Sequence, residues 1–203
     1  MNYLTIISFI FFTALVAFIS WIITKKDDLS TNEGYFLAGR SLSGIVIAGS
    51  LILTNLSAEQ LVGLNGNGFK HGLSSMAWET TSGLSLVIMA LIFLPRYLKS
   101  GFTTVPEFLE ERFDVGTRNM VTGLFLLSLT FVVLPIVLYS GGIAVNSLFN
   151  VSELLNVSYE TSLFIVIALT GIVGGIYAIF GGLKAVAVSD TINGVLLLIG
   201  GLM

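Results

Sequence analysis

Amide, hydroxyl and carboxylate side chains lie together in the middle of an apolar stretch of this chain. Residues 44–64 read GIVIAGSLILTNLSAEQLVGL, in which Asn55, Ser57, Glu59 and Gln60 interrupt a run of aliphatic side chains. A charged side chain near the centre of a bilayer costs at least ~2.5–3.5 kcal/mol. Such groups are tolerated where they face a bundle interior or a watered cavity, and there they mark solute and ion pathways. The pattern therefore predicts a transport site.

The spacing of these residues leaves two arrangements open. On an unbroken helix Asn55 and Glu59 share a face, and Gln60 points ~140° away from Asn55. A break near 53–57 would instead free backbone carbonyls to bind a cation, as broken helices do at the midplane sites of secondary transporters. An interhelical hydrogen bond or ion pair is an equally open interpretation of Glu59.

Two further carboxylates lie in or beside apolar segments. Glu79 begins the polar patch ETTS at 79–82, where it could accept hydrogen bonds from the hydroxyls of a sugar-like solute. The alternative is an interfacial residue near a helix end. Asp190 is either an interfacial acid paired with Lys184 or an anionic residue near the inner mouth that attracts a departing Na⁺.

The composition sets the class of protein. The 203 residues are 55% hydrophobic and only 10% charged, whereas a soluble domain carries about 25% charged residues. We therefore expect a protein surrounded by the lipid bilayer. The chain has no cysteine and one histidine, which excludes disulfides, thiolate metal sites and multi-histidine metal sites. No nucleophile–base–orienter set is recognisable. We therefore expect no enzyme activity, no cofactor and no nucleic-acid partner.

Six apolar segments predict an all-α, polytopic membrane protein with about six transmembrane helices. They are 3–24, 41–64, 73–95, 119–149, 161–182 and 185–203. Eight of the nine Lys and Arg residues fall on one alternate set of the loops between them. By the positive-inside rule that set is cytoplasmic. The prediction is a multi-pass protein of the plasma or inner membrane with its N-terminus outside.

Two connecting segments carry local signals. Thr103 and Thr104 followed by Pro106 and Glu107 predict the start of a short amphipathic helix on the cytoplasmic surface, because they supply a cap, an early proline and a first-turn acid. The glycines of 63–68 follow a membrane segment rather than a strand, so they do not form a dinucleotide fingerprint. We expect them to make a tight extracellular turn.

Taken in order along the chain, several motifs resemble the sodium/solute symporter family. EGYFLAGRSL at 33–42 and SLILTNLSAEQ at 50–60 resemble the entry to the first core helix of that family. FLP at 93–95 followed by TVPEFLEERF at 104–113 is similar to its next cytoplasmic connection. IYAIFGGLKA at 176–185 resembles its glycine-pair signature. The similarity is strongest to the bacterial sodium/sugar branch, which includes the sodium/galactose symporter.

The resemblance implies an inverted-repeat fold of five plus five core helices preceded by one extra helix. Residues 1–203 would form a single transmembrane domain, in which 3–24 is the extra helix and 41–203 is the first repeat, truncated in its last helix. In the family the second repeat brings the hydroxyl ligands of the Na⁺ site, an aromatic inner gate and further sugar contacts. We therefore expect an incomplete Na⁺ site and a missing second half of the transporter, as in a fragment or a truncated product.

The resemblance also assigns roles to individual residues. The positions that match sugar contacts of the sodium/galactose branch are Asn55, Gln60, Glu79 and Ser82. Leu53 and Leu56 match positions whose backbone carbonyls bind Na⁺ where the first core helix unwinds. Asp190 matches an acid on the sodium exit route. The chain departs from the pattern at Val133, where the sugar branch can place an asparagine.

The predicted function is that of the N-terminal part of a secondary active transporter that couples Na⁺ entry to uptake of a sugar or similar small neutral solute. A neutral solute is favoured because the predicted membrane segments hold no Lys or Arg to meet a carboxylate. One alternative keeps the fold and changes the solute to an amino acid, a carboxylate or a vitamin. Others are a sensor that binds solute without moving it, and a truncated fragment without activity.

Overall fold

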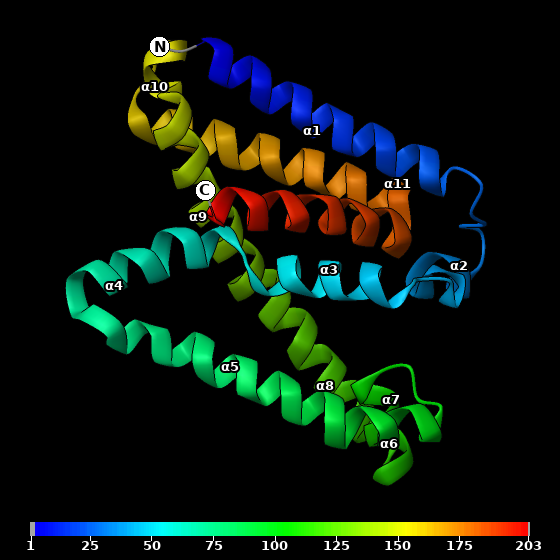
Figure 1. The fold of residues 1–203 in the computed structure, drawn as a ribbon. Coiled ribbons are helices and arrows are strands. Elements are labelled where there is room, and N and C mark those ends of the chain that lie inside the picture. The colour runs from blue at the N-terminus through cyan, green and yellow to red at the C-terminus, as the bar shows by residue number, and fades with distance from the viewer. Residues whose placement is uncertain (1–2, 203) are drawn as a thin grey trace. The chain divides into compact units, whose positions relative to one another are not determined.

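The computed structural model describes residues 3–202, and within them every regular element is helical (Figure 1). The α-helices are α1 (Tyr3–Thr24), α2 (Asn32–Leu37), α3 (Gly44–Asn55), α4 (Asn65–His71), α5 (Met76–Ile88), α6 (Leu94–Ser100), α7 (Val105–Arg112), α8 (Val115–Ser128), α9 (Leu134–Phe149), α10 (Val151–Leu155) and α11 (Tyr159–Leu202). Short 3-10 helices cover Ala38–Arg40 and Gly72–Ser75. The predicted all-α fold is confirmed.

Four continuous helical stretches of the described chain are long and apolar enough to cross a membrane, which makes this a multi-pass membrane protein. They are Leu4–Thr24, Gln60–Ser100, Val115–Phe149 and Tyr159–Leu202. The helices Asn32–Arg40 and Gly44–Asn55, bent by 110°, raise the number to five if they form one span. The sequence predicted six membrane segments. Two of them, 161–182 and 185–203, lie on the single helix α11 in the structure, which accounts for one fewer span. Gly182 (φ 61°, ψ −175°) is nevertheless non-helical, so α11 consists of two limbs.

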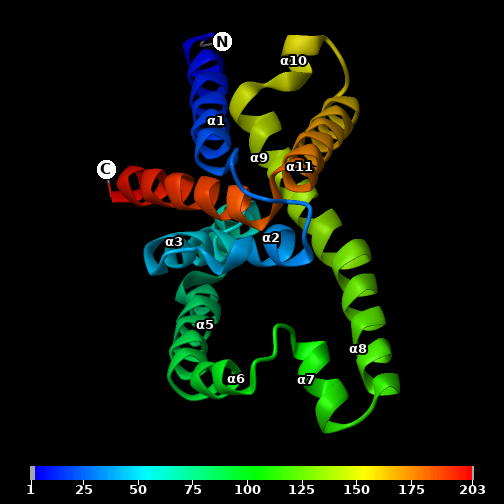
Figure 2. The ribbon, with the colours of Figure 1, turned by 90° about the vertical axis from the view of Figure 1, so that its right-hand side faces the viewer.

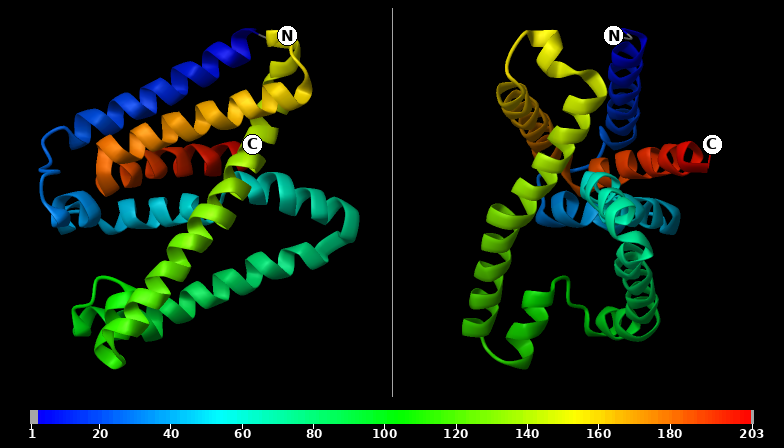
Figure 3. Two further views of the ribbon diagram at one scale, coloured as in Figure 1. Left: turned by 180° about the vertical axis from the view of Figure 1, so that it is seen from behind. Right: turned by 90° about the vertical axis from the view of Figure 1, so that its left-hand side faces the viewer.

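The chain divides into two compact units. The first runs to Ala58 and resumes at Leu138, and the second covers Glu59–Val137. In the first unit α1 lies beside the first limb of α11 and α3 lies beside the second limb (Figures 1 and 3). In the second unit α6 and α7 connect the longer helices α5 and α8 (Figure 2).

Burial differs between the units. The buried apolar residues belong to the first unit, and those of α11 are Val166, Ala185, Ala187 and Val188. None of the described residues of the second unit is buried. Leu91 and Phe131, for example, are each 72% exposed. Apolar side chains directed outward are compatible with lipid as the surrounding medium, where helices associate through close packing and hydrogen bonds.

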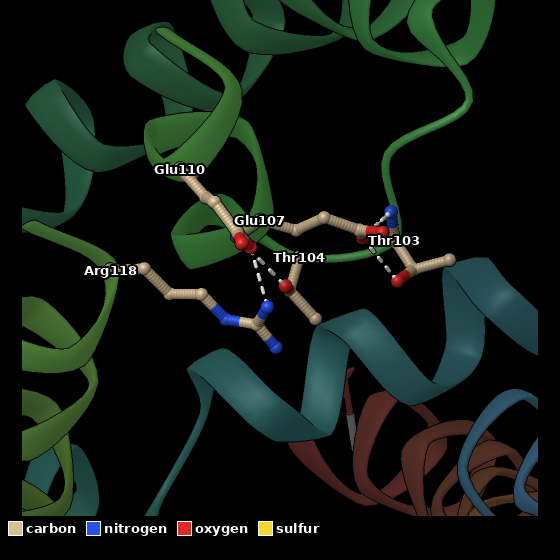
Figure 4. Close-up of polar contacts among 5 residues, drawn as sticks. All are labelled: Thr103, Thr104, Glu107, Glu110 and Arg118. Atoms are coloured by element: carbon tan, nitrogen blue, oxygen red, sulfur yellow. Dashed lines mark hydrogen bonds and ion pairs between the residues drawn. The ribbon is translucent and has the colours of Figure 1, made fainter. Parts of the chain in front are cut away.

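The structure confirms the predicted helix that follows Thr104. The Thr104 hydroxyl oxygen accepts a hydrogen bond from the Glu107 backbone N–H at 3.3 Å. In return, the Glu107 carboxylate accepts bonds from the Thr103 backbone N–H at 2.8 Å and from the Thr103 hydroxyl at 2.7 Å (Figure 4). Arg118 of α8 forms an ion pair with Glu110 of α7. These contacts join the residues before α7 to its first turn, and α7 to α8.

The predicted tight turn at residues 63–68 is wrong. A π-helical segment at Gln60–Leu64 and α4 carry the helix through these glycines, and the chain turns at Gly72 (φ 72°, ψ −156°). A helix satisfies its backbone hydrogen bonds internally, which is decisive in an apolar medium. Glycine tolerates a helix at modest cost. The turn therefore falls at the glycine that adopts a conformation other residues rarely reach.

The hydrogen bonds at the N-terminal cap of α7 predict that the stability of this helix depends on pH. Hydrogen bonds from the Thr103 backbone and hydroxyl lower the pKa of Glu107 below its ordinary value of 4.5. A carboxylate whose pKa is lower in the folded state stabilises that state above its unfolded pKa, and this contribution is lost as the pH falls through the folded pKa. The protection of the α7 amides against hydrogen exchange, corrected for the pH dependence of the intrinsic exchange rate, should therefore fall below pH 4.5, and Glu107→Gln should remove that fall. Glu111→Gln, an exposed change on the same helix, should preserve it; a dependence that survives in Glu107→Gln would contradict the assignment.

Candidate functional site

Helix α3 breaks beside the polar residues that the sequence singled out. The α-helix α3 ends at Asn55, Leu56 is extended (φ −94°, ψ 91°), and helical structure resumes at Ala58. Of the two arrangements that the sequence left open, the structure has the broken helix. The end of α3 is therefore the C-terminus of a half-helix, which carries partial negative charge. Leu53 and Leu56 lie at this end, where carbonyl oxygens of transporter half-helices coordinate Na⁺.

Side chains on the last turns of α3 bind back to their own helix. The Thr54 hydroxyl donates to the Ser50 carbonyl oxygen at 2.9 Å, and the Asn55 Nδ2 amide donates to the Leu51 carbonyl oxygen at 2.9 Å. The Asn55 Oδ1 oxygen takes no part in that bond. Ala58 lies 3.9 Å from where a Cβ on Gly141 of α9 would stand, so small residues allow α9 to approach the chain just after the break.

Asp190 lies on the second limb of α11 and faces α3. Its Oδ2 oxygen accepts a hydrogen bond from the Ser50 hydroxyl at 3.1 Å, and the side chain is half-buried. The alternative in which Asp190 pairs with Lys184 is wrong, because the Lys184 ammonium lies 2.7 Å from Asp27 instead. The structure therefore places a carboxylate one to two turns before the end of the half-helix α3.

Small residues let α3 and the second limb of α11 approach closely, along what we call the α3–α11 seam (Gly49, Ser50, Asp190, Thr191 and Gly194). A Cβ on Gly49 would lie 2.8 Å from the Thr191 Cγ2, and one on Gly194 would lie 3.3 Å from the Gly49 carbonyl oxygen. The Thr191 hydroxyl lies 3.1 Å from the Val46 carbonyl oxygen. Glycine and hydroxyl residues are the usual means of helix packing in membranes. The residue pattern did not single out Ser50 or Thr191, although the nearby glycines were a signal.

The other predicted solute contacts belong to the second unit. Gln60 begins the π-helical segment, whereas Glu79 is exposed near the start of α5. Ser82 follows three residues later, so it shares a face with Glu79. The hydroxyls of Thr80 and Thr81 donate to carbonyl oxygens of their own helix at 2.9 and 2.7 Å. Glu79 and Ser82 are thus brought together on α5, while Asn55, Leu53, Leu56 and Asp190 belong to the first unit.

Three π-helical segments interrupt the long helices of the described chain. They are Gln60–Leu64, Met89–Phe93 and Leu129–Val133. Two of them contain residues that the sequence singled out, Gln60 and Val133. π-Helical turns widen a helix locally and are frequent at functional sites. Nothing in the residue pattern signalled them.

A model of the sodium:solute symporter family matches residues 35–203. The matched region contains the broken helix, the α3–α11 seam and the glycine pair at 181–182. The chain belongs to the sodium:solute symporter family. This membership confirms the resemblance that the motifs at 33–60 and 176–185 indicated.

Individual relatives of this symporter-family chain agree with that assignment. The uncharacterized symporter YidK of Escherichia coli K12 is 55% identical over all of this chain and 36% of its own length. The sodium/glucose cotransporter of Vibrio parahaemolyticus is 33% identical, again over all of this chain and 36% of its own length. The mouse sodium/myo-inositol cotransporter is 36% identical over 93% of this chain and 25% of its own length. The chain thus spans about a third of the length of the first two relatives.

The packing of the α3–α11 seam predicts that alanine substitution at two glycines of α3 has very different effects on stability. Gly49→Ala should destabilise the protein by ~1–3 kcal/mol, because the added methyl group overlaps Thr191. Gly44→Ala is the matched control, since a Cβ there meets nothing within 4 Å. Thermal unfolding of the purified full-length protein in detergent measures both. Equal midpoints for the two variants would contradict the close packing at Gly49.

Proposed function

We propose that this chain forms the N-terminal part of a secondary active transporter, not an enzyme, that couples Na⁺ entry to uptake of a sugar or similar small neutral solute. The observation that carries the proposal is the half-helix end at Leu56, close along the helix to the contact between Ser50 and Asp190. Family membership and the sugar and inositol cotransporters among the relatives support it.

The ion step uses oxygen atoms of the first unit. Na⁺ is a hard cation, and such ions prefer carbonyl and carboxylate oxygens. Carbonyl oxygens of Leu53 and Leu56 would bind Na⁺ at the end of α3, where the helix dipole is negative. Asp190 would receive the ion on its way out, because it lies on the limb packed along α3. The remaining ligands would come from the second repeat, outside these residues.

The solute step uses amides, a carboxylate and a hydroxyl. Asn55, Gln60, Glu79 and Ser82 provide the donors and acceptors that sugar hydroxyls require. A neutral solute is favoured by the engagement of Lys184, which Asp27 holds at 2.7 Å. A carboxylate substrate would need a cationic side chain that is not already paired, and Lys184 is paired with Asp27. Coupling follows if Na⁺ and solute each bind one conformation of the transporter better than the other.

The proposed organisation places the binding residues in one transmembrane domain at 1–203. Helix α1 is the extra helix at 3–24, and 41–203 is the first of two inverted repeats. The distribution of Lys and Arg supports an N-terminus outside the plasma or inner membrane. In that orientation the α6–α7 connection lies in the cytoplasm, as does the loop between α1 and α2.

Uptake into proteoliposomes that contain the full-length protein tests this function. An inward Na⁺ gradient should drive accumulation of a labelled sugar, and a choline gradient of equal size should not. Unlabelled sugars or polyols should compete, whereas amino acids and organic acids should not. Competition by an amino acid or a carboxylate would assign a different solute to the same fold. Sugar binding without Na⁺-driven accumulation would indicate a sensor and contradict the proposal.

Point variants test the solute contacts. Glu79→Ala and Gln60→Ala should each raise the KM for the solute about tenfold or more, because a hydrogen bond to a charged or amide group is lost in the bound state. Thr80→Val is the matched control, since its hydroxyl donates within its own helix. Initial uptake rates at saturating Na⁺ measure the effect. An unchanged KM in both alanine variants would overturn the assignment of these residues.

A further inference from the structure

The break in α11 depends on glycine and on the N-terminal segment packed against it. Gly182 is buried, and its backbone (φ 61°, ψ −175°) lies in a region that is essentially restricted to glycine. A Cβ at this position would lie 3.2 Å from the Tyr35 carbonyl oxygen and 3.2 Å from the Leu29 Cδ2. The second glycine of the family signature therefore both permits the break and lets α2 approach it.

Helix α2 satisfies a carbonyl that the break affects. A non-helical residue interrupts the backbone hydrogen bonds that span it. In a regular helix the Ile179 carbonyl oxygen would accept from the N–H of residue 183, so it is the first carbonyl whose bond spans Gly182. The Tyr35 hydroxyl donates to the Ile179 carbonyl oxygen at 3.0 Å. In an apolar medium an unsatisfied carbonyl is costly, so a donor from outside the helix stabilises the break.

Helix α1 contributes a second contact, on the other side of the break. The Ser20 side chain is fully buried, and its hydroxyl donates to the Ala185 carbonyl oxygen at 2.8 Å. The Tyr177 hydroxyl donates to the same oxygen at 2.7 Å and lies 3.0 Å from the Ser20 hydroxyl. One carbonyl oxygen thus joins α1 to both limbs of α11.

A charge pair provides the third contact. The Lys184 ammonium lies 2.7 Å from the Asp27 carboxylate, with side chains that are 21% and 27% exposed. The second oxygen of Asp27 is buried without a hydrogen-bond partner in the described part of the chain. Because burial reduces solvent screening, removal of either partner would leave a poorly compensated charge.

The turn that follows α2 is itself strained. Ala38, Gly39 and Arg40 all have left-handed backbone angles (φ 53°, 57° and 53°), and Ala38 is 4% exposed. Non-glycine residues adopt such angles at a cost, and they persist where the surrounding structure imposes them. The turn directs the chain from α2 into α3.

We propose that residues 20–35 form a clamp that fixes the angle of α11 at Gly182 and thereby positions Asp190 against α3. The clamp residues are Ser20, Asp27 and Tyr35. They lie before the first core helix, yet they bind Lys184 and Ala185 just after the break and the carbonyl oxygen of Ile179 before it. The limb that starts at Lys184 carries Asp190 fewer than two turns later, so a change of angle moves the carboxylate relative to Ser50. The clamp residues do not touch the ion. They affect the ion step by fixing the position of Asp190.

A thiol probe on α3 tests the clamp without any transport measurement. These 203 residues contain no cysteine, so Ser50→Cys, made in a full-length protein whose cysteines elsewhere are replaced by serine, places a single thiol in the α3–α11 seam. Reaction of this thiol with N-ethylmaleimide should accelerate about fivefold or more when Asp27→Lys or Lys184→Asp breaks the charge pair. The double reversal Asp27→Lys with Lys184→Asp should restore the original rate. Lys26→Asp, a substitution at an exposed residue of the Asp27 loop, changes the net charge by the same amount as Lys184→Asp and should leave the rate unchanged.

A conservative variant covers the case in which a charge reversal prevents folding. Tyr35→Phe removes only the hydroxyl that donates to Ile179 and should accelerate the same reaction. Unchanged rates in every folded single variant would overturn the clamp. Acceleration without rescue by the double reversal would overturn the role of the charge pair, because surface charge alone would then explain the effect.

Transport rates then show whether the clamp serves the ion step, and this part rests on the proposed function. In the Tyr35→Phe variant the KM for Na⁺ should rise about threefold or more, while the solute KM at saturating Na⁺ stays unchanged. Equal changes in both constants, or none, would overturn the link to Asp190. If the unmodified protein shows no Na⁺-dependent uptake, the proposed function fails, and the thiol reaction still decides whether the clamp exists.

Discussion

The structure depends on one constraint: backbone N–H and C=O groups in an apolar medium must find partners. Continuous helices satisfy these groups internally, and most of the described chain is helical for that reason. The informative positions are those where a helix stops. α3 stops after Asn55 and α11 changes direction at Gly182. Each break presents carbonyl oxygens that something other than the helix must satisfy.

The two breaks have different solutions. At Gly182 the Tyr35 hydroxyl binds a carbonyl beside the break, and Ser20 and Asp27 secure the limb beyond it. At that break, protein side chains supply hydrogen-bond and ion-pair partners. The end of α3 is the place where, in our proposal, an ion serves as the partner. The seam between Ser50 and Asp190 connects the two, because it aligns the limb beyond Gly182 with the half-helix. A fixed angle at one break thus supports a binding position at the other.

Sequence patterns predicted the elements whose causes are local. Apolar length predicted the membrane helices, and Thr104 with Glu107 predicted the cap of α7, which the structure confirms. The broken form of α3 was one of two arrangements that the residues allowed. The turn expected at 63–68 was misplaced, because glycine is compatible with both helix and turn, and the apolar medium favoured the helix there. The π-helical segment that contains Gln60 had no signal in the residue pattern. The roles of Asn55, Gln60, Glu79 and Ser82 stay predictions.

By itself, the sequence determined the membrane class, the family motifs and the residues able to bind an ion or a sugar, because hydrophobicity and side-chain chemistry are properties of each residue. Only the tertiary structure decided which groups meet. It paired Lys184 with Asp27 and Asp190 with Ser50, partners that are 157 and 140 residues apart in the chain. It also gave Gly182 its role, since the break requires a positive φ there and Tyr35 and Leu29 pack where a Cβ would lie. Pairings of this kind follow from the packing of distant helices, which no local pattern encodes.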